Sequence, residues 1–304
     1  MRKELLAIAV LAMFVAGCVG QKEDVNYGEN IVILKDKNVL PPAVSAGGSF
    51  DITFTAQNVH QTEDAKNVMI KLYDWGPAAC KIKSIGGLDI KSANSYLLLN
   101  ESRLPSGAER FIQIGGQAPS KSEIAGIQSR CNFKYILNYD SFAITTIDTS
   151  IISQSRLSAL QRSGKSPSFS PTLTTGTGPI KIIFEHANDL PARESDEMAF
   201  DLRVEDQGIG NYVKVPKNTL MVSVPEEFNT TPDGCGVEFN NMGAKDGKRT
   251  YVNNMELTVI KGKTSNYRCK FIAPPVVEER TFFITGRMDY TYVINDDVEV
   301  TITP

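Results

Sequence analysis

A thiol placed for lipid attachment is the most specific chemical signal in this chain. Cys18 closes the sequence Val-Ala-Gly-Cys, directly after an apolar run at 5–15 that follows Arg2 and Lys3. A basic start, an apolar stretch and small residues before the cleavage point are typical of a secretory signal. A cysteine at that point can carry two acyl chains, which hold a protein stably on a membrane. We therefore interpret residues 1–17 as a lipoprotein signal peptide and expect a lipid anchor on Cys18, at the extracytoplasmic face of the cell membrane.

Two other interpretations of this segment fit less well. A retained transmembrane helix at 5–20 would have 16 residues, fewer than the roughly 20 that cross a bilayer core of about 30 Å. It would also make the cysteine incidental. A pilin-type signal, in which the apolar segment is kept as a filament-forming helix, normally needs a longer apolar run.

The remaining cysteines indicate disulfides. Cys80 and Cys131 lie in the first half of the chain, and Cys235 and Cys269 lie in the second. An even number in an exported protein favours disulfide bonds. We expect the pairs Cys80 with Cys131 and Cys235 with Cys269, each worth about 3 to 4 kcal/mol in the chain-entropy model; the other two connectivities would tie the halves together. A zinc site would normally show close C-x-x-C pairs, which do not occur.

Other residues that could do chemistry do not form a recognisable set. Histidine is the usual general base or metal ligand near neutral pH, and the two histidines, His60 and His186, lie in different halves without a nucleophile motif beside them. Carboxylate clusters could bind calcium, but none has EF-hand spacing, and solvated loop charge is the better interpretation. The clusters are Glu194, Asp196 and Glu197 before a strand, and Asp296, Asp297 and Glu299 at an expected last hairpin. We predict no catalytic residue, no cofactor and no metal site, and we interpret His60 as an exposed loop residue.

Two sequons could carry glycans if the chain is exported. Asn100-Glu101-Ser102 and Asn229-Thr230-Thr231 both match N-x-[ST]. An expected turn beside Cys235 makes Asn229 the better candidate of the two.

Composition limits the class of partner. The chain has 304 residues, of which 41% are hydrophobic, with 14 Phe and 10 Tyr, and this favours a folded protein. Without the first 17 residues it carries 30 basic and 34 acidic residues, so it lacks the basic footprint of nucleic-acid binding. We expect membrane contact through the anchor on Cys18, and a protein or glycan partner at the cell surface.

The elements that would position these residues repeat with a period near 150. Residues 50–54 (FDITF) align with 200–204 (FDLRV), and 68–72 (VMIKL) align with 220–224 (LMVSV). The segment from Asn138 to Ile151 also runs in register with the segment from Asp289 to Ile302. Divergent duplication explains this similarity better than chance.

Within each copy the apolar residues alternate, which is typical of half-buried strands. Seven or so short strands per copy, with turn signals between them, predict an all-β protein made of two tandem immunoglobulin-like β-sandwich domains. Only 120–127, which opens with Ser-x-x-Glu, suggests a short helix. Asp246-Gly247 predicts a hairpin turn. The longer expected strands lie at 31–34, 67–73, 110–114, 132–139, 142–152, 180–184, 251–260, 268–272, 281–292 and 298–303.

The start of the first copy resembles a known kind of surface domain. Pro42, Val44, the glycine turn at 46–48, the strand at 49–54 and Asn58 resemble the opening of the CARDB and NPCBM-associated immunoglobulin-like domains of archaeal and bacterial surface proteins. The resemblance covers about 30 residues in each half. It implies an adhesion or scaffolding role loosely, and the family has no catalytic residues to carry over.

These observations predict an ordered arrangement along the chain. We expect a tether at 18–29, one sandwich at 30–153, a Ser/Thr/Gly-rich linker at 154–178 and a second sandwich at 179–304; the rival view of the linker is a helical turn at Leu157 and Leu160 docked on a domain. The leading hypothesis is a non-enzymatic, lipid-anchored binding or spacer module. A subunit of an envelope assembly or filament is the alternative, and an envelope hydrolase is the third class.

Overall fold

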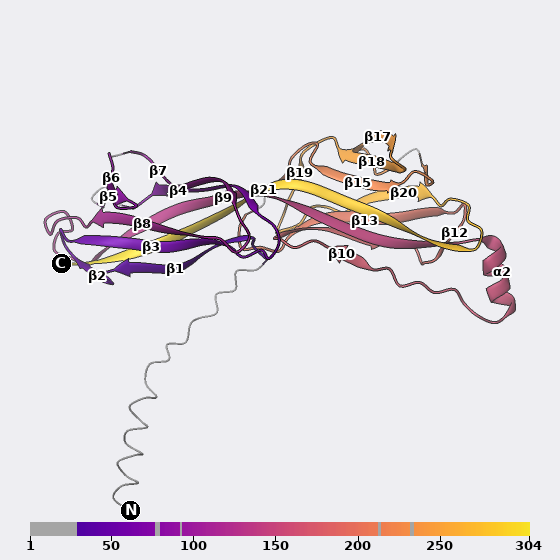
Figure 1. The fold of residues 1–304 in the computed structure, drawn as a ribbon, viewed down its shortest axis with the longest axis horizontal. Helices are drawn as coiled ribbons and strands as arrows, with labels where there is room; N and C mark the ends of the chain where they lie inside the picture. Colours follow the sequence, from indigo (N-terminus) through magenta and orange to yellow (C-terminus); the bar gives the residue numbers. More distant parts are fainter. Residues whose placement is uncertain (1–28, 77–79, 92, 212–213, 232–233) are drawn as a thin grey trace, which may run out of the picture.

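The computed structural model describes residues 29–76, 80–91, 93–211, 214–231 and 234–304. These residues form an elongated molecule built almost wholly of antiparallel strands, with one short helix at one end (Figure 1). The all-β sandwich expected from the alternating apolar pattern is confirmed.

The first half of the chain contributes β1 (Val32–Leu40), β2 (Ala43–Ser45), β3 (Ser49–Asn58), β4 (Ala65–Asp74), β5 (Lys81–Ile85), β6 (Leu88–Asp89), β7 (Tyr96–Leu104), β8 (Glu109–Gln117) and β9 (Ser129–Ile152). The second half contributes α2 (Gln154–Arg162), β10 (Leu173–Thr175), β11 (Ile180–His186), β12 (Ala192–Arg193), β13 (Glu197–Asp206), β14 (Lys214–Val215), β15 (Leu220–Pro225), β16 (Asn229–Thr230), β17 (Phe239–Lys245), β18 (Lys248–Asn253), β19 (Leu257–Thr258), β20 (Tyr267–Ile272) and β21 (Glu279–Thr303).

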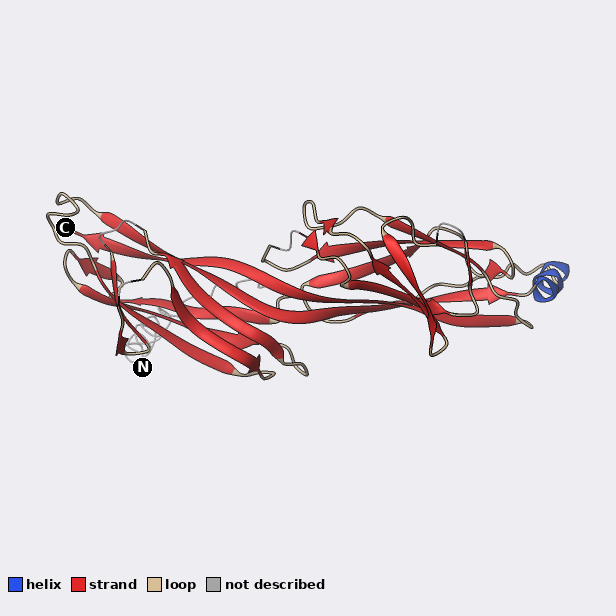
Figure 2. Ribbon diagram, turned by 90° about the horizontal axis from the view of Figure 1, so that it is seen from above, coloured by secondary structure: helices blue, strands red, loops and turns tan. Residues whose placement is uncertain are grey.

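Two very long strands organise the molecule. β9 has 24 residues and β21 has 25, and they pair antiparallel from Ile152 opposite Glu279 to Ser129 opposite Ile302. At about 3.4 Å per residue this two-stranded ribbon is about 80 Å long. The ribbon extends from one end of the molecule to the other, as Figure 2 shows. One sheet therefore continues along the whole rod-shaped molecule.

A smaller sheet covers each end of the ribbon. We call each small sheet, together with the part of the ribbon that it covers, a lobe. In lobe 1, the sheet β1-β3-β8-β5-β6 packs on the ribbon, and Phe54 stacks on Tyr135 with ring centroids 5.0 Å apart. In lobe 2, the sheet β11-β13-β20-β16 packs on it, and β11 approaches so closely at Gly286 that a Cβ there would lie 2.9 Å from Phe184 and Ile182. Odd-numbered residues of β9 and even-numbered residues of β21 face the core in both lobes. Both small sheets therefore cover the same face of the ribbon.

The lobes exchange strands, and this changes the expected division at 30–153 and 179–304. The second half of β21 lies in lobe 1, where Ala43–Ser45 of β2 pair with Thr301–Thr303. The end of β9 lies in lobe 2, where β12 pairs with Ile151 and Ile152. Each lobe is therefore completed by a strand from the other half of the sequence, and a single cluster of buried residues includes both halves.

The internal repeat explains the symmetry of this exchange. The two small sheets have matching strand orders, β1-β3-β8-β5 and β11-β13-β20-β16. The aligned segments 138–151 and 289–302 lie in β9 and β21, which are partners across the ribbon. The repeats therefore face one another like two copies of one unit that have traded their last strands.

Local expectations have mixed outcomes. The segment expected to be a linker holds α2, capped by the Ser153 side chain, and β10, which pairs with β9. None of the residues of α2 is buried, so the helix is present but does not dock on a core. The helix expected at 120–127 is a series of turns, although Ser120 and Glu123 make their capping contacts. The hairpin at Asp246-Gly247 is confirmed: both residues have positive φ, and they join β17 to β18.

Candidate functional site

The residues singled out in the sequence are widely separated in the structure. Cys18, the signal at 1–17 and most of the tether lie outside the described residues. Cys80 is bonded to Cys131 and Cys235 to Cys269, so each bridge lies within one lobe, as expected. Asn100 on β7 and Asn229 on β16 are both exposed.

One of the two acidic clusters lies elsewhere than expected; the other, Glu194, Asp196 and Glu197, lies at the start of β13. Asp296, Asp297 and Glu299 lie within β21, opposite Tyr135, Lys134 and Asn132, and not at a hairpin. Asp296 forms an ion pair with Lys37 of β1, at 2.5 Å. Among the described residues, no group of three His, Cys, Asp or Glu side chains is placed to hold a metal ion.

Three tyrosines of the ribbon meet at the waist, the junction between the two small sheets. Tyr139 lies opposite Tyr292, and Tyr290 is the next core-facing residue of β21. The Tyr139 hydroxyl accepts a hydrogen bond from the Ile31 amide of lobe 1 at 3.3 Å. On the lobe 2 side, the Tyr292 hydroxyl donates to Asp206 at 2.8 Å and accepts from the Gly210 amide at 2.9 Å. Hydroxyls of adjacent ribbon strands thus fix loops from both lobes.

The tyrosine environment is dry. Burial raises the pKa of Tyr139 and of Tyr292 above the ordinary value, and the Asp206 carboxylate raises that of Tyr292 further. The side chains of both tyrosines are fully buried. Because buried hydrogen bonds are costly to break, the waist is a fixed junction.

A cavity of about 690 Å³ opens beside these tyrosines. Three segments line it: the start of the described chain at 29–31, the β3–β4 loop at 59–63 and the stretch 175–178, which begins with the last residue of β10. The first two belong to lobe 1, and the third leads into β11 of lobe 2. The cavity is therefore built by both lobes together.

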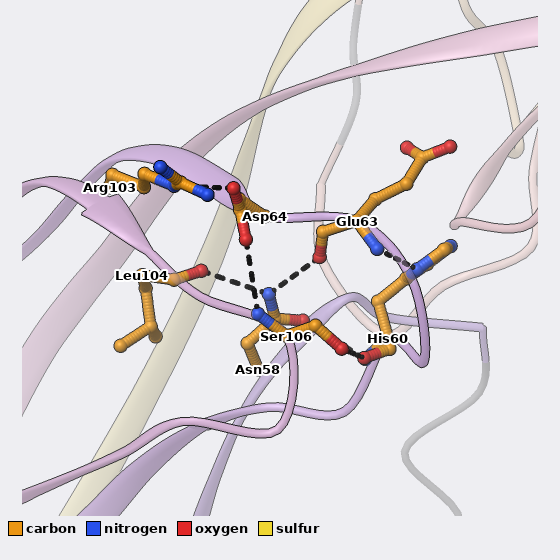
Figure 3. A network of polar contacts seen from close by, with 7 residues as sticks. All are labelled: Asn58, His60, Glu63, Asp64, Arg103, Leu104 and Ser106. Atoms are coloured by element: carbon orange, nitrogen blue, oxygen red, sulfur yellow. Dashed lines mark hydrogen bonds and ion pairs between the residues drawn. The ribbon is translucent and has the colours of Figure 1, made fainter.

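The β3–β4 loop is held in one conformation by its own polar side chains, as Figure 3 shows. Asn58 donates its side-chain amide to the carbonyls of Glu63 and Leu104, at 2.9 and 3.0 Å. Ser106 donates its hydroxyl to the His60 carbonyl at 2.6 Å, and Asp64 accepts from the Ser106 amide at 3.2 Å. Since these polar groups of the loop have partners, the wall that the loop forms is fixed in place.

His60 lies in a loop, as expected, but it is half-buried and not exposed, and it holds this wall. Its Nδ1 accepts the backbone amides of Thr62 and Glu63, at 3.2 and 2.9 Å. A neutral imidazole that accepts at Nδ1 carries its proton on Nε2, and Nε2 contacts the Thr177 hydroxyl on the far side of the cavity. His60 therefore joins the lobe 1 loop to the 175–178 segment.

Carboxylates dominate the charge of the cavity. Glu29 forms an ion pair with Lys181 at 2.8 Å, and the Lys181 ammonium also donates to the Gly176 carbonyl at 2.8 Å. Lys181 is only 7% exposed. The Glu63 carboxylate points away from its own loop (Figure 3), and burial together with the Asp206 and Glu63 charges raises the pKa of Tyr290 to about 12.

Asn30 adds an unusual feature to the lining. The residue is 5% exposed, and neither its amide nitrogen nor its amide oxygen has a hydrogen-bond partner in the described part of the chain. Buried polar groups without partners are rare and costly. The amide oxygen lies beside Gly208, where an added Cβ would be 2.5 Å from it, so this side chain is enclosed within the waist.

This cavity could not be predicted from the sequence. Its residues come from three short segments that no motif connects. Lys181 offered a signal, because a lysine inside the apolar run Ile180–Phe184 must find a partner when the strand is buried.

Comparisons with known proteins give no family. No family model and no curated protein matches the chain. Solved structures with partial likeness include the chitinase ChiA74 from Bacillus thuringiensis, at 10% identity and TM-score 0.22, covering 82% of this chain and 28% of that one. The collagen adhesin from S. aureus has 8% identity and TM-score 0.20, with 89% and 96% covered. The Pseudomonas fluorescens DNA glycosylase AlkC has 13% identity and TM-score 0.23, with 36% and 27% covered.

At these TM-scores the likenesses carry no argument about function. The chain spans about a quarter of the length of the glycosylase and of the chitinase. Within the described residues, no helix has the length and apolar character needed to cross a bilayer.

Proposed function

We propose that the protein is a lipid-anchored, non-enzymatic surface protein that acts as an extracytoplasmic binding module, with the waist cavity as its recognition site. The observation that carries this proposal is the construction of the cavity from both lobes, with walls fixed by the hydrogen bonds of Asn58, His60 and Ser106. Ligand sites are concave, largely pre-formed and often lie between domains.

The anchor is supported by the sequence around Cys18. The described chain starts at Glu29 in the waist, beside the middle of the ribbon, because Ile31 bonds to Tyr139. The short stretch between Cys18 and Glu29 reaches at most about 40 Å when fully extended. A lipid on Cys18 would therefore hold the rod by its middle and keep the cavity close to the membrane.

This attachment favours a binding module over a spacer. A spacer gains height when it is anchored at one end, whereas a rod held by its middle carries both ends at similar distances from the attachment point. A central anchor keeps the waist, more than either end of the rod, at a constant distance from the membrane.

Cell fractionation with a Cys18→Ser variant tests the anchor. We expect the variant to leave the membrane fraction or to persist as an uncleaved precursor, whereas a matched Val19→Ser variant stays on the membrane. Mass spectrometry of the native protein should find a lipid on an N-terminal Cys18. A native chain that still begins at Met1 with an unmodified Cys18 would refute the anchor.

Crosslinking on intact cells tests the role as a binding module. One adduct with a different molecule supports recognition of a partner. A ladder of self-adducts would instead support the alternative of a structural subunit in an envelope assembly.

A further inference from the structure

We propose that the waist cavity binds a small ligand through a primary ammonium group. This inference rests on the proposed function, because it names the chemistry that the same cavity would recognise. Three features of the cavity favour an ammonium group: the charge of the lining, its hydrogen-bond acceptor and the size of the space.

The charge of the lining is negative. Glu29 and Glu63 both line the cavity. Lys181 pairs with Glu29 and donates to the Gly176 carbonyl, so its charge is already engaged. Glu63 has no ion pair with any described residue, and the lining includes no lysine or arginine. One carboxylate therefore faces the cavity without compensation.

The lining also offers a charged hydrogen-bond acceptor. The His60 ring uses Nδ1 on two backbone amides, and its Nε2 contacts Thr177. The Glu63 carboxylate remains as an acceptor without a partner among the described residues. An alkylammonium carries three donors and no acceptor. It matches this arrangement better than a carboxylate, a phosphate or a neutral alcohol does.

The surroundings strengthen such an interaction. Tyr290 is 5% exposed and lies beside Gly178, where an added Cβ would be 3.0 Å from the tyrosine hydroxyl. The Glu63 and Asp206 charges both act on this hydroxyl. Charge-assisted hydrogen bonds at a partly dry wall are about twice as strong as neutral ones. The volume of about 690 Å³ admits an aliphatic diamine, a lysine side chain or an amino sugar.

Titration of the full mature chain with Cys18→Ser, followed by NMR, tests the proposal. The probes are 1,4-diaminobutane, Nα-acetyl-lysine amide and glucosamine, and 1,4-butanediol is the neutral control. We expect saturable shifts at 29–31, 59–63 and 175–178 with at least one amine at about 10 mM, roughly tenfold above a Kd of 1 mM. The diol should give none. The three amines distinguish a polyamine, a peptide lysine and an aminated glycan as the source of the ammonium.

A matched pair of variants assigns the binding to the cavity carboxylate. Glu63→Gln keeps the shape of the side chain and should weaken amine binding about tenfold or more. Glu109→Gln removes a lobe 1 carboxylate that pairs with Lys35 away from the cavity, and it should leave the Kd unchanged. The Kd of the unsubstituted cavity should also rise with ionic strength, because salt screens the attraction.

Several outcomes would overturn the proposal. They are the absence of saturable shifts with every amine, equal binding of the diol, or an unchanged Kd in the Glu63→Gln variant. Each of these leaves the Cys18 fractionation result untouched, so failure of the ammonium site is distinguishable from failure of the surface anchor.

Discussion

Separation of the two halves of the chain should unfold lobe 1. A fragment of residues 29–152 keeps β1 to β9 and the Cys80–Cys131 bridge, but it loses the part of β21 that pairs with Ser129–Asp140. It also loses five core side chains that are each at most 8% exposed: Tyr292, Ile294, Val298, Val300 and Ile302.

The loss can be estimated from buried surface. Burial of a large apolar side chain contributes about 1.5–3 kcal/mol, so five of them withdraw about 7–15 kcal/mol, before the loss of a backbone ladder is counted. The whole free energy of unfolding of a domain is about 5–15 kcal/mol. The fragment should therefore lack a stable native state even with its disulfide formed.

Circular dichroism and NMR provide the assay. We expect no cooperative melting and poor dispersion for 29–152 alone, and recovery of both when the fragment with residues 153–304 is added. As a control, the full chain cut once within the exposed stretch 163–172 keeps both long strands and should melt like the intact protein. A 29–152 fragment that melts cooperatively within a few degrees of the intact chain would refute the strand exchange.

Two further predictions concern single side chains. Tyr292→Phe removes the hydroxyl that bonds to Asp206 and Gly210. The loss should lower the free energy of unfolding by about 1–3 kcal/mol and the Tm by several degrees, whereas Tyr73→Phe at an exposed position should change the Tm little. Equal Tm changes in calorimetry would contradict the role of Tyr292 in fixing the waist. Burial lowers the pKa of His186, so the unfolded chain takes up a proton first as pH falls through about 6.5, and the free energy of unfolding should decrease until the folded pKa is reached. In His186→Gln the free energy of unfolding, measured by chemical denaturation, should depend less on pH between about pH 7 and 5. The same pH dependence in the variant and the unsubstituted protein would contradict this role of His186.

The strands, the repeat and the disulfides could be predicted from the sequence because their signals are local. Alternating apolar residues mark strands wherever they lie, and two cysteines per repeat suffice to suggest the pairs that the structure contains. The 24-residue strand β9 stands where two strands are expected, at 132–139 and 142–152, with a gap at Asp140-Ser141. The alternation continues through it, from Tyr139 to Ala143, and was the signal to follow.

The strand exchange and the cavity were beyond local reasoning. The sequence of a duplicated unit is the same whether its last strand packs in its own sandwich or in that of the other copy. Which of the two sandwiches receives the strand depends on the geometry of the connection between the copies. The cavity depends on that choice, because residues 29–31 and 175–178 become neighbours only when both lobes share one ribbon.

Native-state hydrogen exchange at the waist tests the central claim most directly. If β9 and β21 form one ribbon through both lobes, the amides around the Tyr139 and Tyr292 pair should exchange as slowly as those of the lobe cores at Phe133 and Ile284, because opening them requires unfolding of the shared core. Fast exchange at 139–143 and 288–292, between two protected lobes, would show two separately folded modules joined by a flexible segment and would contradict the account.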